Sequence, residues 1–373
     1  MPILHPIFLI AILALIVFSF METYASDYKN YKGVWVVIVF LIILSGLRED
    51  AGADYGVYAI MYRDFGVSID YSELLEGTLF RENKLPIEWL YSVIGKVFFS
   101  FGLPFFIFTL FLAIVSVGIK YLAFEQSVVY PALSMLLYLF PSYFTGDSGH
   151  MRQAFAMGIL MFSFLFIKKR NLLMFLIMVY LAMGFHKSSA VFVLAYWIAI
   201  VPMNRITLLG MVLISVLLSP FQVYNYISIF ESLAPVEVYS GFSAYSTIEG
   251  DTSTIKFTDL ISIMYMFFVY FYDKDACKQI PYYEYMRNIG VFGICLYFIF
   301  RGSPIFSGRL AAIYLVFMVM VIPNIIAAIK NLQLRRGLHF IVIAYVVFYC
   351  IVYTVMQGQR AGFTIEHYRN YLW

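Results

Sequence analysis

Charged residues are scarce in this sequence. Asp, Glu, Lys and Arg make up 13% of its 373 residues, whereas soluble globular chains carry about 25%. The charges that are present form short clusters, and apolar runs of membrane-spanning length separate these clusters. This distribution excludes an ordinary soluble protein. It predicts an all-α, polytopic transmembrane helical bundle, with the lipid bilayer as its surroundings.

Cysteine and basic tracts are scarce as well. The three cysteines match neither a disulfide framework nor a metal site. No cluster with metal-ligand spacing is visible elsewhere, so we expect no metal and no other cofactor. The net charge is only +3 and no run of Lys and Arg is long, which excludes nucleic acid as a partner.

The sequence also lacks features that would divide it. No Lys or Arg precedes the first apolar run, whereas a cleaved signal peptide needs a positive segment there. Residues 2–22 are therefore expected to be a retained helix. No Gly/Ser-rich linker and no strong internal repeat occur, so we expect one integral membrane domain over residues 1–373.

Twelve apolar runs are present. They lie at about 2–22, 34–47, 103–124, 128–146, 150–167, 171–185, 187–202, 206–220, 257–272, 287–301, 308–328 and 338–356. Some are near the lower length limit for a spanning helix. The sequence therefore predicts about 12 spans.

One further segment differs from these runs. Residues 86–101 are largely apolar but carry Glu88 and Lys96. Two charges at the middle of a bilayer cost several kcal/mol, whereas an amphipathic helix in the membrane plane keeps both in contact with water. We therefore expect an in-plane helix here.

Positive residues give the orientation, because cytoplasmic loops are enriched in Lys and Arg. The clearest cytoplasmic markers are the cluster at residues 168–170 and the basic residues within 330–336. Residues 48–87 carry eight acidic residues against four basic ones, which is typical of an external acidic loop. Residues 221–256 are expected to form a second external loop, and both termini are expected outside.

Helix lengths bring two polar positions to one depth. Arg152 lies 16 residues before Lys168, and His186 lies 15 residues after Asn171. At about 1.5 Å rise per residue, both legs span roughly 24 Å. Arg152 and His186 should therefore lie at similar depth on the outer side of the membrane.

Arginines gather on this outer face. Arg48 follows the run 34–47, and Arg301 and Arg309 flank the turn RGSPIFSGR. A planar guanidinium donates two parallel hydrogen bonds to phosphate oxygens. With Arg152 at a helix start, this set predicts a site for a lipid-linked phosphate. Arginines at helix ends also snorkel to headgroups, which is the alternative interpretation of Arg48 and Arg301.

A base is expected beside this phosphate. His186 can accept a proton near neutral pH, and Asp54 lies in a Gly-containing loop suited to holding a carboxylate. Each also has a structural interpretation, a satisfied histidine for His186 and turn chemistry for Asp54. His150, Glu88 and Lys187 are weaker candidates for the same site.

Short motifs in a fixed order resemble the EpsG family of polysaccharide polymerases. They are Gly46-Leu47-Arg48 with Gly52, Asp54 and Tyr58; Pro86-Ile87-Glu88-Trp89-Leu90; Met151-Arg152-Gln153-Ala154-Phe155-Ala156; Phe185-His186-Lys187-Ser188-Ser189-Ala190; and Arg309-Leu310 with Tyr314 and Ile322-Pro323. Each motif is short, but the ordered set is fairly specific and extends over about residues 46–323. Ala53 departs from the family pattern without affecting the motif, and loop 221–256 has no counterpart.

This resemblance implies a Wzy-like polymerase with a GT-C-like fold in the bacterial inner (cytoplasmic) membrane, with its active site facing the periplasm or the outside. Such a protein transfers a growing O-antigen, capsule or exopolysaccharide chain from undecaprenyl pyrophosphate onto the next lipid-linked repeat unit. Its partner would be the undecaprenyl-pyrophosphate-linked oligosaccharide, with a chain-length regulator as a further candidate. No nucleotide sugar would be used.

Under this resemblance the polar residues take roles. The leaving pyrophosphate would be neutralised by Arg48, Arg152, Arg301 and Arg309, and among these Arg152 and Arg309 would make the main contacts. His186 or Asp54 would activate the acceptor hydroxyl.

Two other functions stay open. A flippase for the same lipid-linked repeat would show internal repeats and charges deep in the bundle, and the sequence shows neither. A membrane O-acyltransferase that modifies the glycan would also use a membrane histidine, but it needs a route for a cytoplasmic acyl donor. A purely structural assembly subunit would not need several arginines on one side.

Overall fold

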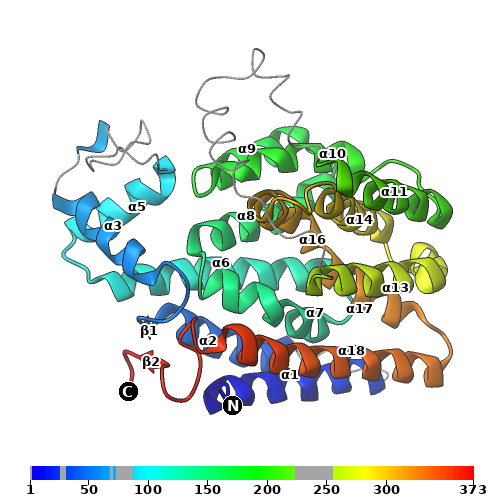
Figure 1. Ribbon diagram of the computed structural model, residues 1–373, viewed down its shortest axis with the longest axis horizontal. Coiled ribbons are helices and arrows are strands. Elements are labelled where there is room, and N and C mark those ends of the chain that lie inside the picture. Colours follow the sequence, from blue (N-terminus) through cyan, green and yellow to red (C-terminus); the bar gives the residue numbers. More distant parts are fainter. Residues whose placement is uncertain (1, 26–30, 68–69, 73–86, 223–254) are drawn as a thin grey trace. The chain divides into compact units, whose positions relative to one another are not determined.

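Helices account for almost all of the described chain (Figure 1). The computed structural model describes residues 2–25, 31–67, 70–72, 87–222 and 255–373. In these ranges the only two strands, β1 (Arg48–Glu49) and β2 (Arg369–Asn370), form a two-residue ladder. The chain divides into two compact units, Met1–Ala190 with Lys330–Trp373, and Val191–Ile329. The all-α class is confirmed, and the single domain stays a prediction.

The first unit is built from apolar helices. They are α1 (Pro6–Tyr24), α2 (Tyr31–Gly46), α3 (Tyr55–Val67), α5 (Trp89–Ser100), α6 (Phe105–Ser127), α7 (Pro131–Tyr138), the π-helix η1 (Leu139–Asp147), α8 (Met151–Lys168), α9 (Leu172–Met183), the start of the 3-10 helix η2 (Lys187–Leu194), α18 (Leu332–Tyr353) and the π-helix η6 (Thr354–Gly358). Most of them coincide with the apolar runs, because helices satisfy their own backbone hydrogen bonds and need no water to do so.

Close packing in this unit depends on small residues. α6 packs against α2 and α8, and α8 packs against α9. A Cβ at Gly46 would lie 2.7 Å from the Leu110 Cα, and one at Gly158 would lie 3.2 Å from the Ser116 carbonyl oxygen. Glycine at these positions therefore lets α2 and α8 approach α6 closely, which is how helices associate when lipid surrounds them.

The start of α7 is capped from another helix. The Glu22 carboxylate of α1 accepts hydrogen bonds from the N–H groups of Ala132 at 2.9 Å and Leu133 at 3.3 Å. Pro131 opens α7 and has no N–H to satisfy. The cap satisfies N–H donors that the first turn of a helix leaves open, and it connects α1 to α7.

The second unit is built around α14. Its elements are the end of η2, α10 (Ala195–Ile198), α11 (Arg205–Leu218), η3 (Ser219–Phe221), α13 (Phe257–Gln279), α14 (Tyr283–Ile299), α15 (Pro304–Phe306), η5 (Ser307–Ala311), α16 (Ala312–Leu315) and α17 (Met318–Ala328). Buried Arg287 of α14 donates to the Asp273 carboxylate of α13 at 2.8 Å and to the Met203 carbonyl at 2.7 Å. Acceptors inside the unit therefore bind the guanidinium of Arg287.

Five helical segments in the described ranges are long and apolar enough to cross a membrane. They are Pro6–Tyr24, Phe105–Ser127, Met151–Lys168, Pro304–Ala328 and Leu332–Gly358. Shorter apolar helices lie at Lys32–Gly46, Leu172–Met183, Lys187–Ile198 and Arg205–Phe221. These segments support a polytopic membrane protein, while the count of about 12 spans stays a prediction.

The segment expected to be an acidic external loop, residues 48–87, is helical in part. α3 occupies Tyr55–Val67 within it, and residues 73–86 lie outside the described ranges. The other expected external loop, residues 221–256, also lies mostly outside them. The helix expected over 86–101 is present as α5, and its placement in the membrane plane stays a prediction.

The two ends of the chain meet in the first unit. Leu4 forms an isolated bridge with Thr364, and the His5 N–H donates to the Phe363 carbonyl at 3.0 Å. The strand pair brings Arg48 opposite Asn370. Both ends therefore lie at the Arg48 end of α2, and their position on the outer side of the membrane stays a prediction.

Candidate functional site

An ion pair between Glu88 and Arg152 joins two helix starts. Glu88 directly precedes α5, and Arg152 lies in the first turn of α8. The Arg152 Nη1 donates to the Glu88 Oε2 at 2.5 Å, and the two side chains are 21% and 9% exposed. Charge-assisted hydrogen bonds are roughly twice as strong as neutral ones. The pair therefore fixes the position of the Arg152 guanidinium.

Glu88 also reaches a third element. The backbone N–H of Lys187 donates to its other carboxylate oxygen, Oε1, at 3.2 Å. Nearby, the Gly184 carbonyl at the end of α9 accepts the N–H groups of Leu90 at 3.0 Å and Tyr91 at 3.1 Å. The start of α5, the start of α8 and the turn after α9 therefore meet at Glu88. The sequence had placed Glu88 only among the weaker candidates.

Two tyrosines enclose the guanidinium of Arg152. Its Cζ lies 5.7 Å from the ring centroid of Tyr58 and 5.8 Å from that of Tyr91. The Arg152 Nε is buried and donates no hydrogen bond to any residue in the described ranges. Cation–π contacts hold the charge in place, and the 21% of the Arg152 side chain that stays exposed keeps it within reach of a ligand.

Asp54 and His150 form a second pair. Asp54 directly precedes α3, and His150 directly precedes α8. The His150 Nδ1 lies 3.2 Å from the Asp54 Oδ2, and the side chains are 52% and 51% exposed. Asp54 has a positive φ of 62°, a conformation that short polar side chains tolerate better than most. The carboxylate can orient the imidazole and leave its Nε2 available for a proton.

Gly52 sets the spacing of this pair. It has a φ of 90°, and a Cβ there would lie 1.6 Å from the Ser148 carbonyl oxygen. The two backbones are therefore in contact two residues before Asp54 and two residues before His150. A side chain at Gly52 would push the two loops apart and separate the pair.

His186 lies half-buried in the turn after α9. Its Nδ1 lies 2.6 Å from the Ser188 Oγ. Next to it, Phe185 stacks on Phe155 of α8 with ring centroids 3.9 Å apart. The structure thus brings this turn to the Arg152 end of α8, and the common membrane depth of His186 and Arg152 stays a prediction. The role of His186 as a base stays a prediction.

Arg48 is fully buried. Its Nε donates to the Ala51 carbonyl at 2.8 Å, its Nη1 donates to the Ser45 carbonyl, and its Cζ lies 5.5 Å from the Tyr55 ring centroid. Burial lowers the pKa of the Arg48 guanidinium from its usual value. In this structure Arg48 therefore organises the loop 47–55, and its contact with pyrophosphate stays a prediction.

Arg301 and Arg309 belong to the second unit. Arg301 lies in the turn after α14, where its Nη2 donates to the Asp259 Oδ2 at 2.6 Å and its Nε donates to Oδ1 at 3.0 Å. The Tyr297 hydroxyl donates to the same carboxylate at 2.8 Å. Arg309 lies in η5 and is partly exposed. The fork of Arg301 is thus engaged by a carboxylate, and the assignment of both arginines to pyrophosphate stays a prediction.

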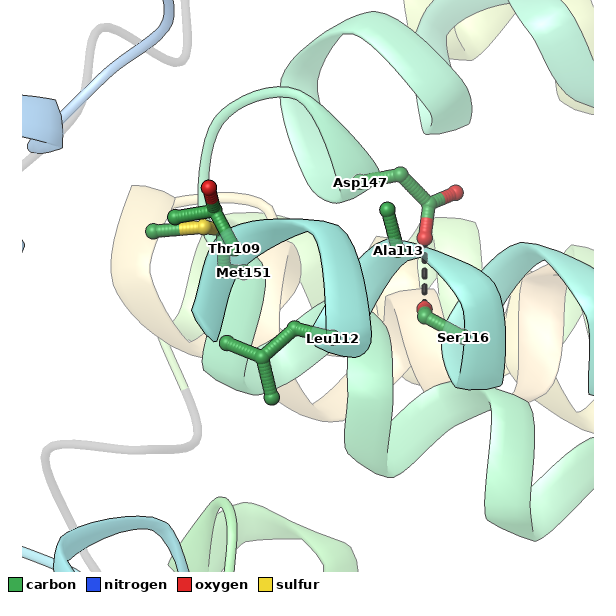
Figure 2. A pocket seen from close by; sticks show the side chains of 6 residues that line it. All are labelled: Thr109, Leu112, Ala113, Ser116, Asp147 and Met151. Carbon is green, nitrogen blue, oxygen red and sulfur yellow. Dashed lines mark hydrogen bonds between the residues drawn. The ribbon is translucent and has the colours of Figure 1, made fainter. Parts of the chain in front are cut away.

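A buried network lies between α6 and η1. Lys120 and Asp147 form an ion pair of 2.6 Å, and both side chains are 0% exposed. Ser116 donates to the Asp147 Oδ1 at 2.5 Å, and the Tyr138 hydroxyl donates to Oδ2 at 2.6 Å. Figure 2 shows Asp147 pointing toward Ser116 beside a cavity of about 10 Å³. A cavity of that size admits about one water molecule.

The sequence did not single out Lys120 or Asp147. Each lies near the end of an apolar run, where a charge commonly reaches the interface. The signal that could have identified them is the presence of two opposite charges on neighbouring spans. Met151, the first residue of α8, also lines the cavity. The network therefore lies directly under the helix start that carries Arg152.

Metal ligands do not gather in the described part of the chain. No group of three or more His, Cys, Asp and Glu there could hold a metal ion. The expectation that the protein uses no metal rests on the sequence pattern and stays an expectation.

Apolar helices, buried ion pairs and polar residues gathered at helix starts define this chain as a polytopic helical membrane protein. The chain belongs to the EpsG family, whose family model matches residues 34–370. This is a family of Wzy-like polysaccharide polymerases. Neither a search of curated proteins nor a search of solved structures found a match.

Proposed function

We propose that this polysaccharide polymerase is a membrane glycosyltransferase. It transfers a growing glycan from undecaprenyl pyrophosphate onto the next lipid-linked repeat unit, on the outer face of the bacterial inner membrane. Membership of the EpsG family supports polymerisation. The observation that supports pyrophosphate chemistry is the Arg152 guanidinium, held at a helix start by Glu88, Tyr58 and Tyr91. The proposed architecture is GT-C-like, with about 12 spans and an in-plane α5.

The proposed reaction is a glycosyl transfer. The oxygen of the acceptor hydroxyl bonds to the anomeric carbon of the donor glycan, and the bond from that carbon to the pyrophosphate oxygen breaks. The hydroxyl proton passes to a base, and the leaving pyrophosphate keeps the electron pair of the broken bond. The site therefore needs a base near the acceptor and cationic donors near the leaving group.

Arg152 and Lys187 are the proposed donors to the leaving group. Arg152 lies at the start of the 18-residue helix α8, where the helix dipole also favours an anion. Because Glu88 neutralises Arg152, the exposed ammonium of Lys187 supplies the net positive charge. Glu88 holds the Arg152 guanidinium and the Lys187 backbone in one place.

The remaining arginines take subsidiary proposed roles. Contact of Arg309 with the pyrophosphate, with Arg301 as a helper, stays a prediction from the sequence. Arg48 is fully buried, so it contributes by holding the loop that carries Asp54.

The proposed base is His150, oriented by Asp54. The 3.2 Å contact between the two side chains and their half-exposed position support this assignment, since a base must reach both its orienting group and the substrate. His186 is the alternative base. Its Nδ1 lies 2.6 Å from the Ser188 Oγ.

The test is complementation of a strain that lacks the gene. Wild-type protein should restore a ladder of polymer lengths on a polysaccharide gel. Arg152→Ala should yield only the single repeat unit on its carrier, with protein at wild-type level on an immunoblot. The matched control is Lys169→Ala, at the exposed C-cap of the same helix, which should keep the full ladder.

Other outcomes would change the proposal. An unchanged ladder with Arg152→Ala would remove Arg152 from the site. An unchanged ladder with altered acetylation in the deletion strain would favour the O-acyltransferase. Loss of even the single repeat unit in the deletion strain would point to an earlier step.

One observation favours a flippase as the second candidate. The Lys120–Asp147 pair is fully buried between helices, and buried ion pairs of this kind occur in transport pathways. Purified protein in detergent distinguishes the two functions, because sidedness is absent there. Conversion of lipid-linked repeats into polymer under these conditions requires a polymerase, and a flippase would leave the repeats unchanged.

A further inference from the structure

The C-terminal segment after η6, residues 359–373, packs onto the loop that leads to Asp54. The Gly52 N–H donates to the Ala361 carbonyl at 2.7 Å, and the Tyr371 N–H donates to the Leu47 carbonyl at 2.8 Å. Between these two bonds, β2 pairs with β1. The segment therefore follows the loop from Leu47 to Gly52 on one side.

Buried aromatic side chains anchor this segment. Phe363 is 0% exposed and Tyr368 is 1% exposed. Phe363 packs edge-on against Phe8 of α1 and Phe144 of η1, and the Tyr368 hydroxyl donates to the Leu44 carbonyl of α2 at 2.7 Å. The segment is thus connected to three elements of the first unit, and its position is set by the core.

Two glycines let the segment press on the loop. Gly362 has a φ of 76°, and a Cβ there would lie 3.2 Å from the Ala51 Cα. On the opposite side, Gly52 is in contact with the Ser148 carbonyl. Ala51 and Gly52 are therefore enclosed between the C-terminal segment and the loop before α8. Asp54 lies two residues after Gly52, and His150 lies two residues after Ser148 in the loop before α8.

We propose that residues 359–373 are a positioning element for the Asp54–His150 pair, acting through Ala51 and Gly52. This inference rests on the proposed function, because it assigns the pair to the acceptor side of that reaction. A change in the segment would move Asp54 relative to His150 while Arg152, Glu88 and Lys187 keep their own contacts. The rate of transfer should then fall, and the affinity for the lipid-linked substrate should change little.

Gly362→Ala in the full-length protein tests the proposal, with Gly337→Ala as the matched control. Gly337 lies in α18, and a Cβ there would meet nothing within 4 Å. In a detergent assay with lipid-linked repeat units, Gly362→Ala should lower kcat at least ~tenfold, as a small displacement of a catalytic pair does. Its KM should change less than about threefold, and Gly337→Ala should match wild type in both.

A cross-linked variant separates a loss of positioning from a loss of folding. Glu49 and Arg369 face each other in the strand pair, so a Glu49→Cys/Arg369→Cys disulfide should form at such a spacing. The oxidised variant should keep wild-type kcat, and adding the cross-link should restore part of the rate lost in Gly362→Ala. Loss of activity on oxidation would overturn the proposal, because it would show that the segment must leave the loop during turnover.

Two failures can be separated. If the wild-type protein makes no polymer from lipid-linked repeats, the proposed function fails and the segment is not at issue. If wild type polymerises and Gly362→Ala has wild-type kcat and KM, the positioning role alone is wrong. A fall in both kcat and unfolding temperature without rescue by the cross-link would assign the segment to stability only.

Discussion

Two ion pairs in the first unit are alike in length and differ in their surroundings. Lys120–Asp147 measures 2.6 Å and both side chains are 0% exposed, whereas Glu88–Arg152 measures 2.5 Å with 9% and 21% exposed. Asp147 accepts three side-chain donors, so its charge is fully compensated. Arg152 is partly exposed, and its buried Nε has no hydrogen-bond partner among the described residues.

The difference separates a structural pair from a binding pair. A closed network in which every polar atom is satisfied stabilises one arrangement of helices and offers nothing to a ligand. A pair at a helix start, with aromatic rings on its faces and part of the guanidinium side chain exposed, is held in place and can still bind an anion. Four predictions test this comparison.

The largest effect is expected at the closed network. Asp147→Leu leaves the Lys120 charge buried and unpaired, which should cost about 3–5 kcal/mol of folding free energy. Thermal unfolding of the purified protein in detergent measures this loss. The double variant Lys120→Met/Asp147→Leu should regain most of the stability and polymerise. A stable double variant that makes no polymer would contradict a purely structural role for the network.

The next effect concerns the base. His150→Gln removes a proton acceptor next to Asp54 and should lower kcat about 10²-fold or more, with unfolding temperature unchanged because the side chain is half exposed. His186→Gln should lower kcat less than about tenfold. Single-turnover rates with lipid-linked repeats measure both. The reverse ranking would make His186 the base.

Arg152→Lys should have a smaller effect than removal of the charge. A lysine keeps one positive charge but lacks the planar fork that engages Glu88 and a phosphate together. We expect kcat to fall about tenfold, which is about 1.4 kcal/mol of transition-state stabilisation. The same assay at several substrate concentrations measures it. Wild-type kcat in Arg152→Lys would show that only charge matters here.

The smallest effect is expected at Lys96. Lys96 shares the segment 86–101 with Glu88, but Glu88 pairs with Arg152 and the Lys96 Nζ lies 5.2 Å from the Tyr71 ring centroid. Lys96→Met should change the free energy of unfolding by no more than about 0.5 kcal/mol and leave the polymer ladder intact. Loss of the ladder would connect α5's far end to the site.

Local patterns predicted what depends on local chemistry. Scarce charge and long apolar runs predicted an all-α membrane protein, because a helix in lipid satisfies its own backbone. Helix lengths placed Arg152 and His186 at one depth, since rise per residue is constant. The ordered motifs from Gly46 to Pro323 predicted the family, and the match over residues 34–370 confirms it.

The sequence could not predict which charged side chains pair, because the partners come together only when the chain folds. Glu88 lies 64 residues from Arg152, and His150 lies 96 residues from Asp54. No spacing rule connects positions on different helices. The interpretation of Glu88 as a weak candidate came from its own segment alone, while its importance comes from the three elements that meet there.

The amino-acid sequence by itself determined the membrane environment, the helices and the family of this protein, since each follows from composition or from short motifs. Only the tertiary structure decided which charged side chains are buried in a protein network and which stay accessible to a ligand. Lys120 and Arg152 are both cations on apolar helices, and local sequence singled out Arg152 by its helix start but did not show how deeply either would be buried. Neighbouring helices bury Lys120 completely and leave Arg152 partly exposed, because packing sets the solvation of each charge.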